Sequence, residues 1–137
     1  TSDVLVVDCD ILLPAAVQSV ITESNADKVK AKLVLECANG PVTPEGEAIL
    51  AKKGVIIVPD VVVNCGSAIV CSFERTQGLT DEYWDMETIM ARLKDRITKA
   101  YHATYNTSVE KKISLRNAAW INALLKIEKS MKARGWL

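Results

Sequence analysis

The 137-residue sequence has a single histidine, four cysteines, no net charge and no long apolar run, and each shortage excludes a class of protein. One histidine and no C-x-x-C spacing argue against a zinc site, and we expect no metal. Seventeen basic residues balance seventeen acidic ones, so no charge excess favours nucleic acid or an anionic membrane. The apolar runs are well under a membrane span, and no basic-then-apolar signal opens the chain. We expect a cytoplasmic protein.

The four cysteines are Cys9, Cys37, Cys65 and Cys71. Their spacing fits no disulfide framework of a secreted protein. The alternative is that one of them pairs with His102 for nucleophilic chemistry. We expect them to behave as small buried hydrophobic residues.

Three short apolar segments predict strands buried on both faces, at residues 11–14, 33–36 and 55–59. A short helix is expected within 21–32, with Thr22 or Ser24 as its N-cap. A second helix is predicted over 43–54, where Thr43 precedes Pro44 and Gly54 marks the stop. Strands that alternate with helices indicate right-handed crossovers and a parallel sheet. Residues 4–7, with the sequence VLVV, predict a further strand.

From Val62 onward the apolar period becomes helical. A stripe of apolar residues at helical spacing predicts one long helix: Met86, Ile89, Met90, Leu93, Ile97, Ala100 and Tyr101. Residues 115–134 predict another, closed by Gly135. We therefore expect an α/β fold, part of a doubly wound (Rossmann-like) parallel sheet followed by long C-terminal helices. The phosphate-binding turn G-x-G-x-x-G of such a fold occurs nowhere in the sequence.

The junction after the second predicted strand contains Asn39 and Gly40, followed by Pro41. A left-handed turn explains Gly40, and Pro41 fixes its own φ. Asn39 has two interpretations. Its amide either points into the crevice where open α/β sheets bind ligands, or satisfies the backbone of the turn. Asn64, after the third predicted strand, has the same two interpretations.

Four segments resemble the glutamate/leucine/phenylalanine/valine dehydrogenase family, and glutamate dehydrogenases in particular. They are CDILLPAA (9–16), ANGPVTPEGEAIL (38–50), VPDVVVNCGSAIVCSFE (58–74) and LRNAAWINALLKI (115–127). The resemblance implies the cofactor-binding portion of a longer NAD- or NADP-dependent enzyme that converts glutamate to 2-oxoglutarate and ammonia. It also implies a homo-oligomer, by family a hexamer, with its catalytic lysine and aspartate outside these residues. Residues 1–137 would form a single domain, the distal half of a dinucleotide-binding domain (about 1–80) with C-terminal helices (about 81–137).

The resemblance also implies the roles of particular residues. Ala15 would lie along the cofactor, and Asn39 would hydrogen-bond near the nicotinamide ribose. Asn64 would lie close to both the nicotinamide and the amino group of the substrate. Ala68 and Cys71 would line the substrate pocket, on one side of a helix that starts near Asn64.

The family pattern N-A-G-G-V-x-V-S-Y-F-E is altered here to NCGSAIVCSFE. Ala68 replaces a valine, and Cys71 replaces a serine whose hydroxyl donates to the side-chain carboxylate of glutamate in the glutamate-specific members of the family. A thiol is a weaker donor than a hydroxyl. Two alternatives therefore stay open: another amino-acid dehydrogenase with a less polar substrate, or a catalytically silent binding or assembly module.

Overall fold

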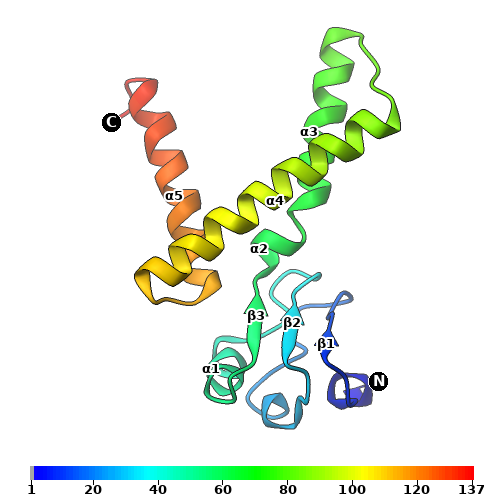
Figure 1. The fold of residues 1–137 in the computed structure, drawn as a ribbon, viewed down its shortest axis with the longest axis vertical. Helices are drawn as coiled ribbons and strands as arrows, with labels where there is room; N and C mark the ends of the chain where they lie inside the picture. Colours follow the sequence, from blue (N-terminus) through cyan, green and yellow to red (C-terminus); the bar gives the residue numbers. More distant parts are fainter. Residues whose placement is uncertain (1) are drawn as a thin grey trace. The chain divides into compact units, whose positions relative to one another are not determined.

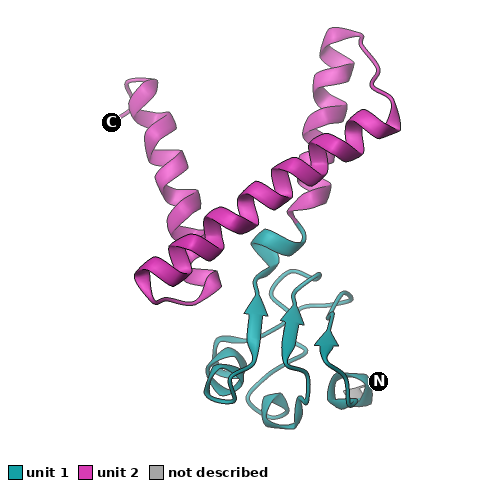
Figure 2. Cartoon of the chain, in the orientation of Figure 1, with its two compact units in different colours: residues 1–64 teal, residues 65–137 magenta. Residues whose placement is uncertain are grey.

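The computed structural model describes residues 2–137 and divides the chain into two compact units, residues 1–64 and 65–137 (Figure 2). The boundary between the units lies between Asn64 and Cys65. Each unit is described by itself.

Unit 1 is built on a parallel three-stranded sheet with the order β1-β2-β3 (Figure 1). The strands are β1 (Ile11–Leu12), β2 (Leu33–Leu35) and β3 (Ile56–Val58), and Leu33 lies opposite Ile11 on one side and Ile56 on the other. The helical elements are η1 (Ser2–Val6), η2 (Ala26–Lys28), α1 (Pro44–Lys52) and α2 (Asp60–Val63). The three predicted strands and their parallel order are thereby confirmed, although each strand is shorter than its apolar segment.

Helix α1 forms where local signals predicted a helix. The Thr43 side chain accepts a hydrogen bond from the Gly46 N–H at 3.2 Å, Pro44 occupies the first turn, and Gly54 adopts a positive φ of 76° after the end. Leu50 points from α1 into the core and is fully buried. Burial of such a side chain stabilises the unit by roughly 1.5–3 kcal/mol.

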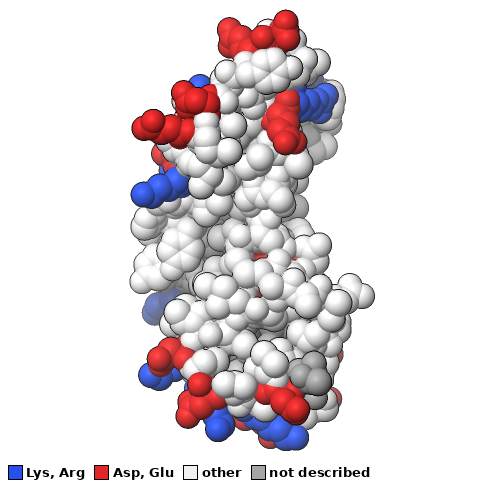
Figure 3. Space-filling view, turned by 90° about the vertical axis from the view of Figure 1, so that its right-hand side faces the viewer, with Lys and Arg blue, Asp and Glu red and all other residues white. Residues whose placement is uncertain are grey.

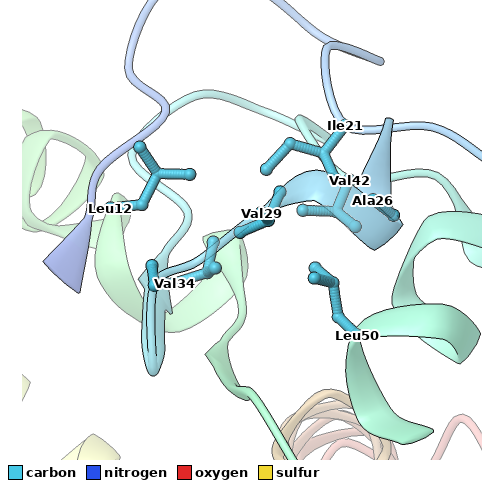
Figure 4. Packing of buried hydrophobic residues seen from close by; sticks show 8 residues of the cluster. Leu12, Ile21, Ala26, Val29, Val34, Val42 and Leu50 are labelled. Carbon is cyan, nitrogen blue, oxygen red and sulfur yellow. The ribbon is translucent and has the colours of Figure 1, made fainter. Parts of the chain in front are cut away.

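The core of unit 1 lies between the sheet and the segments that precede β2 and follow it (Figure 4). Its members are apolar and buried, and they come from β1, the 20–31 segment, β2, residue 42 and α1: Leu12, Ile21, Ala26, Val29, Ala31, Val34, Val42 and Leu50. Residues from both segments that connect the strands contribute to this core, together with β1 and β2.

Two local predictions for unit 1 are wrong. Residues 4–7 are not a strand, because Ser2–Val6 forms a 3-10 helix. The helix expected within 21–32 is reduced to one 3-10 turn, Ala26–Lys28, and neither Thr22 nor Ser24 is its N-cap. The Asn25 side chain explains the difference, since its Oδ1 accepts from the Thr22 N–H and its Nδ2 donates to the Val20 carbonyl, both at 2.8 Å. Side-chain bonds of this kind compete with helix formation.

Unit 2 consists of three helices, α3 (Cys65–Thr80), α4 (Met86–Lys111) and α5 (Leu115–Ala133), with α4 packed against both others. Side chains cap two of them. Asp85 accepts from the Thr88 N–H at 2.7 Å to begin α4, and Ser114 accepts from the Asn117 N–H at 3.2 Å to begin α5. The predicted helices over 86–101 and 115–134 are confirmed, and none of the helices in the described part of the chain could span a membrane.

Apolar side chains at the sheet margins are more exposed than strands buried on both faces would be. Ile11 in β1 is 49% exposed and Ile56 in β3 is 58% exposed. The expectation of buried cysteines is wrong for Cys71, whose side chain is exposed on α3. The other three cysteines are half-buried.

Candidate functional site

The carboxyl ends of the three strands of unit 1 meet at one edge of the sheet, called here the carboxyl edge (Figure 1). Ala15 lies in the loop after β1, and Asn39 lies in the turn after β2. A backbone hydrogen bond from the Ala38 N–H to the Pro14 carbonyl, at 2.9 Å, joins these two loops directly beside both residues. The structure therefore brings Ala15 and Asn39 to the same edge, where open α/β sheets bind their ligands.

The turn that carries Asn39 depends on glycine. Gly40 has a φ of +53°, which an L side chain rarely adopts, and a Cβ built on it would meet no atom within 4 Å. The Gly40 carbonyl accepts from the Ser19 N–H at 2.8 Å, and the Pro41 carbonyl accepts from the Val20 N–H at 2.9 Å. The turn is thus fixed through its backbone, and the exposed Asn39 side chain is left to make other contacts.

Asn64 approaches the same turn from the neighbouring strand. It is the C-cap residue of α2, the short helix that follows β3. Its side-chain Nδ2 donates to the Asn39 Oδ1 at 2.6 Å, so the two amides predicted as ligand contacts form a pair. This contact orients the Asn39 amide with its oxygen toward Asn64 and its nitrogen away from it. A pair of neutral amides offers hydrogen-bond donors and acceptors without charge, which suits a polar ligand that contains amide or hydroxyl groups.

Two carboxylates that sequence reasoning did not assign to the site support this arrangement. Glu36 follows β2 and is fully buried, and its Oε2 accepts from the Asp60 N–H at 2.9 Å. The Asp60 carboxylate accepts from the Gly40 N–H and from the Val61 N–H, each at 2.8 Å. Asp60 is the first residue of α2, whose N-cap is Pro59, and its side chain binds the turn after β2. An acidic residue at the end of an apolar strand was the available sequence signal for Glu36.

The two predicted substrate-pocket residues lie on α3 in unit 2. Ala68 and Cys71 are three residues apart and exposed, on one side of a helix that begins directly after Asn64. Gly66 lies between them and Asn64. A Cβ on Gly66 would lie 3.4 Å from Ile97 Cδ1, an ordinary contact with the end of a flexible side chain of α4. Ala68 and Cys71 are therefore presented on the surface of unit 2, and their relation to the amide pair of unit 1 stays a prediction.

Charged side chains of unit 1 gather around the ends of the strands opposite to the carboxyl edge (Figure 3). There Lys32 Nζ contacts Asp10 Oδ1 at 2.8 Å, and this hydrogen bond holds the pKa of the Asp10 carboxyl below its ordinary value. Within residues 2–137 no cluster of three or more His, Cys, Asp or Glu side chains could hold a metal ion. The polar groups that the structure places at the carboxyl edge are the two amides, backbone groups and the Glu36 and Asp60 carboxylates.

The sequence of this chain is similar to a protein family and to known members of it. The sequence model of the Glutamate/Leucine/Phenylalanine/Valine dehydrogenase family matches residues 1–135. An NAD-specific glutamate dehydrogenase of Staphylococcus aureus is 40% identical over 129 residues, which is 94% of this chain and 31% of that protein. The chain thus spans about a third of the length of the curated relatives it matches.

Solved structures give the same similarity. The crystal structure of glutamate dehydrogenase from Peptoniphilus asaccharolyticus superposes with a TM-score of 0.86 and 35% identity, over 91% of this chain and 32% of that chain. The Leu-bound hetero-hexameric glutamate dehydrogenase from Thermus thermophilus superposes with a TM-score of 0.92 and 27% identity, over 97% of this chain and 32% of that chain.

Proposed function

This chain belongs to the Glutamate/Leucine/Phenylalanine/Valine dehydrogenase family, and on that basis we propose that it is the cofactor-binding portion of an NAD(P)-dependent glutamate dehydrogenase. The whole enzyme would oxidatively deaminate glutamate to 2-oxoglutarate and ammonia. The observation that carries the proposal is the Asn39–Asn64 amide pair at the carboxyl edge of a parallel sheet.

The residues at the carboxyl edge fit the nicotinamide half of NAD or NADP. Asn39 is exposed, Gly40 leaves open space beside it, and Ala15 presents only a methyl group in the loop after β1. The nicotinamide ring and its ribose would be held and oriented by Asn39, Asn64 and Ala15. This ring accepts the hydride when the cofactor is bound. Since the sequence contains no G-x-G-x-x-G turn, the pyrophosphate would be held by other residues of the whole enzyme.

In this proposal, residues 1 to about 80 form the distal half of a dinucleotide-binding domain, and the remaining helices follow it. Asn64 would also face the amino group of the substrate, and Ala68 and Cys71 would line the pocket for its side chain. The exposed Cys71 thiol would then face the side-chain carboxylate of glutamate. A glutamate dehydrogenase with these residues is expected to bind that carboxylate more weakly than one with a hydroxyl.

A second candidate function follows from the same two side chains. Neither the exposed Ala68 nor the exposed Cys71 supplies a strong hydrogen-bond donor. This favours, as the alternative, a dehydrogenase of the same family that acts on an amino acid with a less polar side chain.

We also propose that the whole enzyme is a cytoplasmic homo-oligomer. A structural relative that is described as hetero-hexameric supports an oligomer, while identical subunits follow only from the family resemblance. Support for the compartment comes from the four free cysteines, which form no disulfide in the described residues.

The test is an activity assay of the protein produced from the complete gene that contains this chain. NADH or NADPH formation would be followed with glutamate, norvaline, leucine and phenylalanine as substrates. We expect glutamate to give the highest kcat/KM. A preference for norvaline or leucine would establish the second candidate, and no turnover with any amino acid would contradict dehydrogenase function.

A further inference from the structure

Asp60 connects the two segments that carry the amide pair. Its Oδ2 accepts from the Gly40 N–H, in the turn that carries Asn39, and its Oδ1 accepts from the Val61 N–H at the start of α2. Its carbonyl accepts from the Asn64 N–H at 2.8 Å, at the end of the same helix. One residue therefore contacts the backbone of both amide-bearing segments.

A second hydrogen bond joins the same two segments, with the acceptor side chain on the β2 side and the donor N–H on the α2 side. The buried Glu36 carboxylate, directly after β2, accepts from the Asp60 N–H, at the start of α2. A side chain from each strand end thus binds the backbone of the other segment. Two such bonds fix both the distance and the rotation between the turn after β2 and helix α2, whereas a single bond would leave rotation about it open.

We propose that Asp60 is a positioning residue: it holds the Asn39 turn at the distance from α2 at which Asn39 and Asn64 pair, and thereby sets the affinity of the carboxyl edge for the nicotinamide half of the cofactor. The second part of this inference rests on the proposed function. Asp60 needs no contact with the cofactor for this role.

The chemistry of the residue makes the inference specific to aspartate. A carboxylate has two acceptor oxygens, and here they serve N–H groups of two different segments. Asparagine has one acceptor oxygen and one NH₂ donor, so Asp60→Asn can keep only one of these bonds. Asp60→Ala keeps neither. The two variants should therefore form a graded series.

The control is a second aspartate that caps a helix in unit 2. The Asp85 carboxylate also accepts from a backbone N–H, that of Thr88, at 2.7 Å. Asp85→Ala should lower the unfolding temperature as a lost helix cap does, without an effect on the Asn39 turn. It separates a general loss of stability from a loss of positioning.

The experiment uses the protein from the complete gene. Hydrogen exchange of the Gly40 amide would be measured by mass spectrometry, and the KM for NAD and kcat by steady-state kinetics. We expect Asp60→Ala to accelerate hydrogen exchange of the Gly40 amide by roughly tenfold or more, because the variant lacks the hydrogen bond that protects this amide. We expect it to raise the KM for NAD by roughly tenfold, with a smaller change in kcat. Asp60→Asn should lie between Asp60→Ala and the parent, and Asp85→Ala should match the parent in both measurements.

Two results would overturn the inference: parental Gly40 exchange in a folded Asp60→Ala protein, or accelerated exchange with a parental KM for NAD. If Asp60→Ala does not fold, Asp60→Ser, which removes the carboxylate and keeps a small polar side chain, decides by the same two measurements. A parent protein that neither binds NAD nor oxidises an amino acid would contradict the proposed function instead. Gly40 exchange in the variants would still decide whether Asp60 holds the turn.

Discussion

Gly46 is a helical glycine whose replacement by alanine should destabilise the protein, contrary to the usual effect in a helix. A Cβ on Gly46 would lie 2.9 Å from the Ile21 carbonyl oxygen and 3.3 Å from its carbonyl carbon. Real Cβ atoms essentially never lie as close as 2.9 Å to another atom. The atoms that the added Cβ would meet belong to the backbone, which cannot move aside as the end of a flexible side chain can. The Ile21 peptide group would have to move.

The magnitude follows from two opposing effects. Alanine is favoured over glycine inside a helix by about 0.8–1 kcal/mol. Against this, the Ile21 carbonyl accepts the Thr43 N–H at 2.9 Å, and its displacement would weaken a bond worth about 0.5–1.5 kcal/mol. Overpacking of a tight core contact costs a further 1–3 kcal/mol, roughly. We expect Gly46→Ala to lower the free energy of unfolding of unit 1 by about 0.5–3.7 kcal/mol, after subtraction of the helix gain.

The matched control is Gly78→Ala in α3, where an added Cβ would meet no atom within 4 Å. This substitution should stabilise unit 2 by up to about 1 kcal/mol. Urea titrations of the protein followed by NMR signals of each unit would give both values. A stabilising effect of Gly46→Ala, similar to that of Gly78→Ala, would refute the reasoning that the start of α1 is packed against the Ile21 backbone.

Three further predictions concern activity and pH. Residues 1–137 alone should form no NADH from NAD and any amino acid, and calorimetry should show NAD binding weaker than micromolar; turnover or tight binding would show that the site is misplaced. In the whole enzyme, Cys71→Ser should raise kcat/KM for glutamate roughly tenfold, because a charge-assisted hydrogen bond contributes about 1.5–3 kcal/mol. The substitution should leave kcat/KM for norvaline unchanged. An unchanged kcat/KM for glutamate in a folded Cys71→Ser variant would place Cys71 outside the substrate pocket. The Thr88 N–H bond lowers the pKa of the Asp85 carboxyl from its ordinary 3.8, so the carboxylate stabilises α4 above that pH, and the stabilisation is lost as the pH falls through the lowered pKa. Unfolding temperatures of the parent and Asp85→Asn should therefore converge in acid, and a gap that stays constant with pH would contradict this.

Local sequence signals predicted those parts of the fold that depend on local interactions. Thr43, Pro44 and Gly54 act within a few residues of α1, and they placed both of its ends. The prediction failed within 21–32, where the Asn25 side chain binds the Val20 carbonyl and the Thr22 N–H. Cap-forming residues signal a turn and a helix start alike, and the sequence alone does not separate the two.

The two amides of the candidate site were predictable from the sequence, and the contacts that position them were not. Asn39 and Asn64 were singled out as strand-end amides, and the structure pairs them across 25 positions of sequence. The Glu36–Asp60 and Asp60–Gly40 contacts span 24 and 20 positions. Their partners are backbone N–H groups, which every residue except proline carries. No residue pattern in a single sequence identifies such a partner, so these contacts required the structure.

Cofactor binding through the amide pair is the central claim, and isothermal calorimetry of NAD with the protein from the complete gene tests it most directly. The comparison is between the parent, Asn39→Ala, Asn64→Ala and the control Asn106→Ala, which removes an exposed amide from α4. We expect each of the first two variants to weaken NAD binding roughly tenfold, as the loss of about 1.4 kcal/mol requires, and the control to bind as the parent does. Parental affinity in folded Asn39→Ala and Asn64→Ala proteins would contradict the claim that the carboxyl edge binds the cofactor.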